Sequence, residues 1–234
     1  VGTATTREAP VGDIRRVAVT DRSTNRLAPI GTSKGVSTKE VQKRLQELGF
    51  WLSAFDGTYG TTTSQAVMAF QKYVGLTRTG KVDQKTADGL SCARFRAFSG
   101  ISQVWTLVEV DKGRQLLFIV KNGVTVSVLN TSTGSGKPYR EKNKNKPGTY
   151  LSGVAITPNG WHKVYWEWTD GWKPGDLGRI YRPKYVFGGV AIHGMTSVPG
   201  YPASHGCIRL SLPAMDMVWK LGWIKRGISV WVHE

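Results

Sequence analysis

Gly189-Val190-Ala191-Ile192-His193-Gly194 and Ser204-His205-Gly206-Cys207-Ile208-Arg209 are the two segments that govern the second half of this chain. The first is an apolar run that predicts a strand ending at His193. The second places Cys207 between a glycine and an apolar residue, and Gly206 lets the backbone turn tightly there. Two of the chain's four histidines and one of its two cysteines gather here. No packing requirement explains that combination, so we interpret it as a catalytic site.

An acyl transfer needs a nucleophile, a base that takes its proton, and donors for the developing oxyanion. Cys207 is the candidate nucleophile, and His193 is the candidate base because a strand end presents it rigidly. The two imidazoles and the Arg209 guanidinium are expected to lower the pKa of the thiol by favouring its charged form. Backbone amides beside Gly206 are expected to point toward the oxyanion.

Two other interpretations of the cysteine stay open. A zinc site made by His193, His205 and Cys207 has suitable ligand types. However, His205 and Cys207 lie so close in sequence that joint ligation is strained, and no acidic general base is nearby. A disulfide between Cys92 and Cys207 is the second alternative, since these are the chain's two cysteines.

Residues 101–234 have the pattern of a β-rich domain. We expect strands over 103–110, 115–120, 124–129, 161–168, 186–193 and 230–232, with one helix over 211–221. Asn122-Gly123 indicates a type I′ hairpin between two of these strands. The basic segment 137–146 is expected to be a mobile loop. This run of short strands favours a sandwich or a barrel-like fold.

Residues 36–95 have the pattern of a small three-helix domain. Ser37-Thr38-Lys39-Glu40 has the spacing of a capping box, and Gly49 and Gly75 are expected to end the first two helices. A third short helix starts near Asp83. Residues 1–35 contain no aromatic residue and are expected to form a flexible arm or linker. The expected fold class is therefore a multidomain α+β protein.

The net charge of +16 comes from 32 Lys and Arg against 16 Asp and Glu. Such a charge attracts polyanions, which include nucleic acids and the carboxylates and phosphates of a bacterial cell wall. We find no nucleic-acid-binding motif. No apolar run reaches the roughly 20 residues that a membrane-spanning helix needs.

The helical region resembles the peptidoglycan-binding domain found beside many cell-wall enzymes. The resemblance rests on Val41-Gln42-Lys43-Arg44-Leu45-Gln46, on Asp56-Gly57-Thr58-Tyr59-Gly60-Thr61-Thr62-Thr63, and on Ala66-Val67 followed by Phe70-Gln71. The last helix departs from the family in carrying Gly89, which costs about 1 kcal/mol relative to Ala. The resemblance implies peptidoglycan as the partner of this domain.

The C-terminal region resembles the L,D-transpeptidase catalytic domain. The motif from Ser204 to Arg209, preceded by His193-Gly194, carries this resemblance, with support from Pro147-Gly148-Thr149-Tyr150. It implies that Cys207 is the nucleophile and His193 the base, with the Gly194 carbonyl orienting the imidazole. His205, Gly206 and Cys207 would line the oxyanion site, and Ser204 and Arg209 would contact substrate.

The family implies a defined reaction and place of action. Its members attack a tetrapeptide stem of peptidoglycan, release the terminal D-alanine, and pass the acyl group from a cysteine thioester to an amine, which gives a 3→3 cross-link. The implied location is the bacterial cell wall or periplasm after secretion, carbapenems are the implied inhibitors, and no cofactor or metal is needed. An L,D-carboxypeptidase that uses water, and a non-catalytic wall-binding protein, stay open as alternatives.

Overall fold

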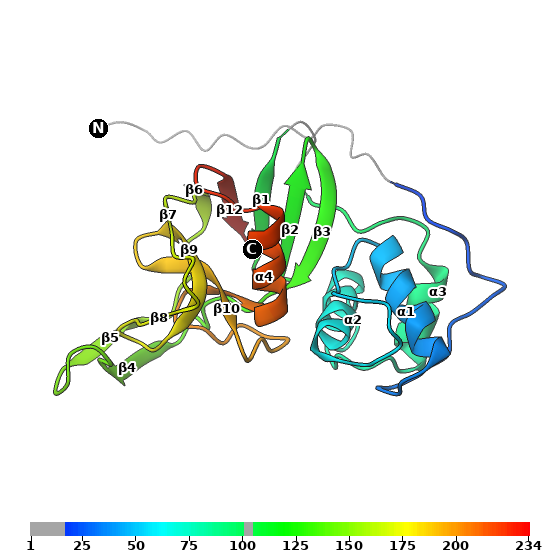
Figure 1. Cartoon of the computed structure of the whole chain (residues 1–234), viewed down its shortest axis with the longest axis horizontal. Coiled ribbons are helices and arrows are strands. Elements are labelled where there is room, and N and C mark those ends of the chain that lie inside the picture. Colours follow the sequence, from blue (N-terminus) through cyan, green and yellow to red (C-terminus); the bar gives the residue numbers. More distant parts are fainter. Residues whose placement is uncertain (1–16, 101–104) are drawn as a thin grey trace.

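The computed structural model describes residues 17–100 and 105–234. Three helices form one part of the molecule, and a β-rich part with one further helix lies beside it (Figure 1). The expected α+β multidomain class is confirmed. No helix in these described ranges has the length and apolarity needed to cross a membrane.

The N-terminal helices are α1 (Val36–Glu47), α2 (Thr61–Val74) and α3 (Gln84–Cys92). The expected end of α2 is confirmed, because Gly75 is left-handed with φ of 76°. Asp83 caps α3 by accepting a hydrogen bond from the Thr86 amide at 2.8 Å. The predicted capping box at Ser37 is wrong: the N-cap of α1 is Gly35, two residues before Ser37, and the helix has no side-chain cap.

Two buried glutamines build the loops between these helices. The Gln42 amide donates to Thr58 O and Thr63 Oγ1, both at 3.0 Å, and accepts from the Gly57 amide at 2.9 Å. Gln71 does the same for the following loop, since it donates to Lys81 O at 2.9 Å and accepts from the Gly80 amide at 2.8 Å. Much of the Asp56–Thr63 motif therefore serves to shape a loop around Gln42.

Part of the expected flexible arm lies against the helices. Within residues 17–35, Leu27 is only 4% exposed, and Thr20 O accepts a 2.9 Å hydrogen bond from buried Arg44. The Val19 amide donates to Arg94 O at 2.9 Å. Residues 17–35 therefore differ from the flexible arm that the sequence predicts, because Leu27 is buried and Thr20 O accepts a hydrogen bond from Arg44 of α1. Residues 1–16 lie outside the described part.

The first sheet has the strand order β3-β2-β1-β12-β6. Its members are β1 (Leu107–Asp111), β2 (Leu116–Lys121), β3 (Val124–Asn130), β6 (Gly160–Lys163) and β12 (Ser229–His233). Asn122 and Gly123 both have positive φ, 47° and 78°, so the expected type I′ hairpin between β2 and β3 is confirmed. The last strand, β12, lies between β1, to which it is parallel, and β6, to which it is antiparallel.

The second sheet has the order β11-β10-β9-β7, with β8 also paired to β9. Its members are β7 (Trp166–Glu167), β8 (Trp172–Lys173), β9 (Ile180–Phe187), β10 (Val190–Met195) and β11 (Ile208–Ser211), and α4 (Leu212–Leu221) follows. The two sheets are open, and together with α4 they form the β-rich sandwich-like domain that the sequence predicts.

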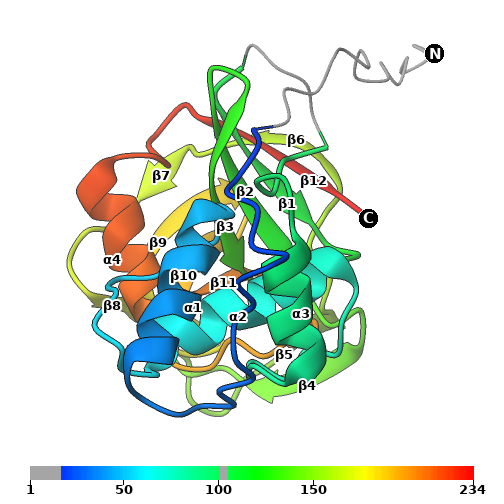
Figure 2. The ribbon, with the colours of Figure 1, turned by 90° about the vertical axis from the view of Figure 1, so that its right-hand side faces the viewer.

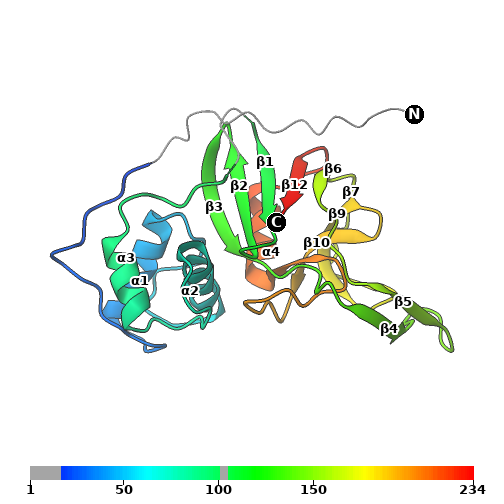
Figure 3. The same ribbon diagram turned by 180° about the vertical axis from the view of Figure 1, so that it is seen from behind.

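Three predicted segments differ from the structure. The strand expected over 186–193 is two strands, β9 and β10, which turn at Gly188 with φ of 47°. The strand expected over 161–168 divides into β6 and β7, which belong to different sheets. The mobile loop expected over 137–146 contains β4 (Pro138–Lys142), which pairs with β5 (Tyr150–Val154) in a hairpin that projects from the domain (Figure 3).

Two hydrophobic cores share the central strands β1 and β2. Alternate side chains divide between them, so that Phe118 joins the core with the helical domain, and Leu117 and Ile119 join the core with the second sheet and α4. The helical domain thus covers the outer face of the first sheet (Figure 2). Since burial of this apolar face contributes to folding, the two parts stabilise each other.

Candidate active site

The end of β10 and the start of β11 bring the predicted residues together. The two strands are parallel, with Ile192 beside Ile208 and His193 beside Arg209. Cys207 comes directly before β11, so the same register places it next to β10. A pocket of about 140 Å³ opens there. It is lined by five of the predicted site residues, which are His193, Ser204, His205, Cys207 and Arg209.

His193 is buried, and one of its two ring nitrogens is fixed. Nδ1 lies 2.9 Å from the carbonyl oxygen of Gly194, which can only accept, so Nδ1 carries the proton and Nε2 keeps its lone pair. Burial lowers the pKa of His193 to about 4, against the raising effect of the Gly194 hydrogen bond. The imidazole is therefore neutral near pH 7 and can accept a proton.

Glycine is the residue type that fits at position 194. A Cβ there would lie 2.8 Å from a ring carbon of Tyr181 and 3.2 Å from side-chain carbons of Leu212 and Met215. The absence of a side chain keeps β10 close to α4 and holds the carbonyl that orients His193. The role that the sequence gives to Gly194 is consistent with this geometry.

The electrostatic expectation for Cys207 is wrong in direction. Burial raises the pKa of the thiol, although an amide hydrogen bond from Ala191 and the charge of Arg209 act to lower it. Sγ also lies 3.8 Å from the carbonyl oxygen of Gly189. The raised pKa keeps this half-buried thiol protonated at rest, so a neutral imidazole in the same pocket could serve as its base only by taking the proton during attack.

The turn before Cys207 uses two of its own polar groups. The Gly206 amide donates to Ser204 Oγ at 3.0 Å, and Ser204 Oγ donates to the carbonyl of Cys207 at 2.5 Å. The Gly206 amide and the Ser204 hydroxyl are therefore engaged within the turn. This leaves the amides of His205 and Cys207 as the candidates for an oxyanion site, and it gives Ser204 a role in shaping the turn.

Thr157 is a site residue that the sequence analysis missed. Its hydroxyl donates to the carbonyl of Gly206 at 2.6 Å and accepts from the Gly134 amide at 2.9 Å. Gly206 has φ of 136°, and a Cβ there would lie 2.8 Å from Ile156 O. The adjacent residues Ile156 and Thr157 thus both contact Gly206 and constrain the turn, yet no sequence motif links them to it.

His205 faces the projecting hairpin rather than the base position. Its ring packs edge-on against Tyr139 of β4, with centroids 4.8 Å apart, and its Nε2 lies 3.7 Å from Glu141 Oε1. The hairpin thereby contacts the site through His205.

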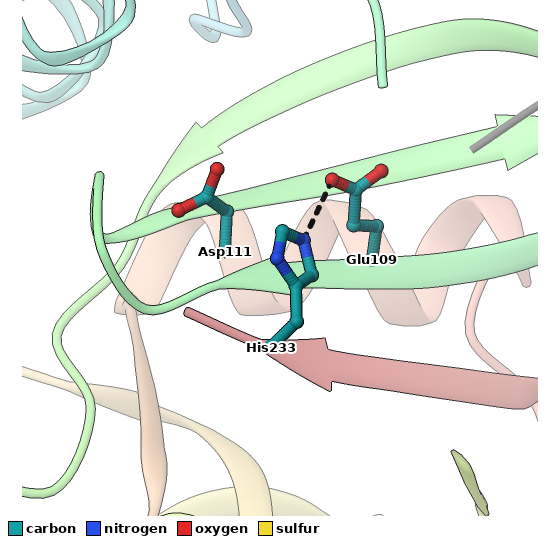
Figure 4. Close-up of side chains that lie close together, drawn as sticks. All are labelled: Glu109, Asp111 and His233. Carbon is teal, nitrogen blue, oxygen red and sulfur yellow. Dashed lines mark hydrogen bonds and ion pairs between the residues drawn. The ribbon is translucent and has the colours of Figure 1, made fainter. Parts of the chain in front are cut away.

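The zinc alternative does not match the geometry of the described residues. The ligand atoms of His193, His205 and Cys207 do not gather within 4.8 Å of one another. One other group does: Glu109, Asp111 and His233 (Figure 4). In that group, His233 Nε2 lies 3.0 Å from Glu109 Oε1, and Asp111 pairs with Arg114. Each of these three side chains already has a partner, and the Arg114 guanidinium disfavours a cation, so we interpret the group as a structural ion-pair cluster.

Cys92 and Cys207 are both free thiols, which excludes the disulfide alternative in this structure.

Comparisons with known proteins divide the chain into the same helical and β-rich parts as the structure does. Residues 106–232 match the L,D-transpeptidase catalytic domain family, and residues 34–90 match the family described as a putative peptidoglycan binding domain. An L,D-transpeptidase from Xylanimonas cellulosilytica has a similar crystal structure, with a TM-score of 0.78, 38% identity, and coverage of 88% of this chain and 97% of that chain.

One curated relative has a different printed activity. A probable N-acetylmuramoyl-L-alanine amidase from Bacillus licheniformis is 31% identical over 179 residues. The match covers 71% of this chain and 46% of that protein, so this chain spans about half the length of the relative. The catalytic family instead covers most of the β-rich part, including the His193 and Cys207 pocket. This chain belongs to the L,D-transpeptidase family, with a peptidoglycan-binding domain preceding its catalytic domain.

Proposed function

We propose that this protein is a cysteine acyltransferase that forms 3→3 cross-links between peptidoglycan tetrapeptide stems. The observation that carries the proposal is the pocket in which Cys207 lies with His193, whose Nδ1 is fixed by the Gly194 carbonyl. A neutral imidazole with Nε2 as its basic nitrogen, next to a thiol, is the pairing that nucleophilic acyl transfer requires.

In the acylation step, His193 Nε2 takes the thiol proton as Sγ bonds to the carbonyl carbon that precedes the terminal D-alanine. The amides of His205 and Cys207 stabilise the oxyanion of the tetrahedral intermediate. The bond from carbon to the D-alanine nitrogen then breaks, and that nitrogen takes the proton from His193. D-alanine leaves and a thioester remains on Cys207.

In the transfer step, an amine from a second stem attacks the thioester carbonyl. His193 takes a proton from that amine, the C–S bond breaks, and the proton returns to the sulfur. The products are a new amide cross-link and the free thiol. Arg209 lines the same pocket, and its guanidinium suits a carboxylate of the stem.

The helical domain and the net charge support action at the wall. We propose that the domain binds peptidoglycan by shape and that the charge of +16 adds a salt-sensitive attraction to anionic wall polymers. The full chain should sediment with insoluble peptidoglycan at about 0.15 M salt, where exposed charges are screened. Loss of all binding at that salt would leave only a nonspecific basic surface. This role places the protein outside the cytoplasm, and nucleic acid is not its partner in this proposal.

Mass spectrometry with a purified tetrapeptide donor tests the chemistry. We expect a thioester on Cys207 that lacks D-alanine, and its conversion to a cross-linked dimer when an amine acceptor is added. A carbapenem, whose strained carbonyl resembles the donor amide, should give a one-to-one adduct on the same residue. Cys207→Ser should form neither adduct, whereas Cys92→Ser should form both.

Two outcomes distinguish the alternatives. Hydrolysis without dimer at high acceptor concentration would assign the protein as an L,D-carboxypeptidase. A folded protein that gives no adduct with either compound would refute the catalytic proposal and leave a wall-binding protein.

A further inference from the structure

Helix α2 of the peptidoglycan-binding domain carries a buried lysine that no step of the reaction uses. Lys72 is 2% exposed, and its Nζ donates to Gln115 O and Thr131 O, both at 2.9 Å. Both carbonyls belong to the catalytic domain. Burial, with a smaller contribution from the charge of Arg78, lowers the pKa of Lys72 to about 6. The protonated and the neutral amine each have at least two N–H groups, so both forms can satisfy the two carbonyls.

The segment that begins at Thr131 is the support of the Cys207 turn. Thr131 Oγ1 donates to Arg209 O at 2.8 Å, and the Arg209 amide donates to Ser132 O at 3.0 Å. Thr133 O accepts from the amides of Ala203 and Ser204 at 3.0 and 2.9 Å. A displacement of this segment would therefore move both sides of the nucleophile.

A second group of contacts joins α2 to the segment between β10 and Cys207. Gln65 Nε2 donates to Val198 O at 3.2 Å, and Asn130, which also donates to Val198 O, donates to Gln65 Oε1 at 2.6 Å. Arg78 Nη1, just beyond α2, donates to Gly200 O at 2.9 Å. The fit at Gly200 is close, because a Cβ there would lie 2.9 Å from the Cβ of Arg78.

We propose that the peptidoglycan-binding domain is a positioning element of the active site, in which Gln65, Lys72 and Arg78 hold the two backbone segments that support Cys207. These are positioning residues, since each acts through carbonyls of residues 115, 131, 198 and 200 and none lines the pocket of Cys207. The proposal adds to the proposed function a structural dependence of the chemistry on the wall-binding domain, and its kinetic assay rests on that function.

Acylation of the full chain by a soluble carbapenem tests this coupling without any role for wall binding. We expect Lys72→Met to slow the acylation step at least tenfold, with a smaller change in the reversible binding constant, since the nucleophile is displaced. Lys39→Met is the matched control, because Lys39 is an exposed lysine on α1, and it should acylate like the parent. A thermal melt shows that each variant is folded at the assay temperature.

Two milder variants keep the test decisive if Lys72→Met does not fold. Gln65→Ala and Arg78→Ala each remove one contact with the segment between β10 and Cys207, and each should slow acylation about threefold. Arg78→Lys, which keeps a donor for Gly200 O, should recover part of the rate. Folded variants that all acylate within twofold of the parent overturn the proposal.

A failure of the proposed function gives a different result. If the parent forms no adduct, the coupling is tested by the pH profile of Cys207 alkylation with iodoacetamide, which needs no substrate site. Variants that shift this profile by half a pH unit or more support the coupling, and unchanged profiles overturn it.

Discussion

Replacement of Gly206 by alanine tests whether the turn before Cys207 is as constrained as its geometry indicates. Gly206 has φ of 136°, and an added Cβ would lie 2.8 Å from the Ile156 carbonyl oxygen. A side chain in such a backbone region costs about 1–3 kcal/mol. Displacement of the neighbouring carbonyl also weakens the Thr157 hydrogen bond to Gly206 O, which is worth about 1 kcal/mol.

We expect Gly206→Ala to destabilise the protein by about 3 kcal/mol, the middle of the summed costs. For a chain of this size, that lowers the melting temperature by about 6–12 °C. Because the turn carries the nucleophile, a displacement near 1 Å should also slow acylation by about 100-fold. The assay combines a thermal melt with the rate of carbapenem adduct formation.

Gly136→Ala is the matched control. Gly136 also has positive φ, 72°, but nothing lies within 4 Å of the position of its added Cβ. It should lose only about 1 kcal/mol, through backbone strain alone, and should acylate like the parent. The reasoning is refuted if Gly206→Ala melts and acylates like Gly136→Ala, because the turn would then be free to adapt.

The remaining predictions concern four further side chains. Acylation should stay constant from pH 7 to about pH 5 and fall toward pH 4, because the His193 pKa of about 4 keeps the base neutral above that value; a loss centred near pH 6.5 would contradict this. Cys207 should be alkylated with a pH midpoint above that of a free cysteine thiol, because burial raises its pKa, and a lower midpoint would restore the low-pKa expectation. Thr157→Val should destabilise the fold by about 1–3 kcal/mol, since it leaves buried partners unsatisfied, whereas Thr169→Val at an exposed position should have no measurable effect in the same melt. Burial acts to lower the pKa of His233, but its hydrogen bonds to Glu109 and the Glu234 carbonyl outweigh burial and raise the pKa. The stabilisation from protonated His233 is therefore present below the unfolded-state pKa and is lost as the pH rises through the folded-state pKa. His233→Gln should lower the melting temperature more at pH 6 than at pH 9, and equal effects would count against the ion pair.

The parts of the fold that the sequence predicts correctly are those with local causes. Asn122-Gly123 specifies its turn because both residues tolerate positive φ, and Asp83 caps its helix through a bond to an amide three residues away. The candidate site residues are equally local, since strand pairing in the right register brings His193 beside Arg209. A short motif can encode all of these.

The errors have non-local causes. Ser37 has a good capping sequence, but Gly35 is fixed by a 2.9 Å hydrogen bond from its amide to Gly57 O, and α1 starts from there. The β4–β5 hairpin is exposed along most of its length, so it lacks the alternation of apolar residues that marks a strand. In the sequence Lys72 has the appearance of a surface lysine, because the carbonyls that accept its hydrogen bonds belong to the distant residues 115 and 131.

The wrong expectation for Cys207 shows how a motif can identify a site and still mislead about its electrostatics. The motif names the charged neighbours of the sulfur, and these neighbours do favour a thiolate. It says nothing about the protein packed around the sulfur, and in the structure that burial has the largest effect on the pKa of the thiol. Burial also keeps His193 neutral. Desolvation thus keeps Cys207 protonated and His193 unprotonated at rest, and in the mechanism that we propose the proton passes between them only during attack.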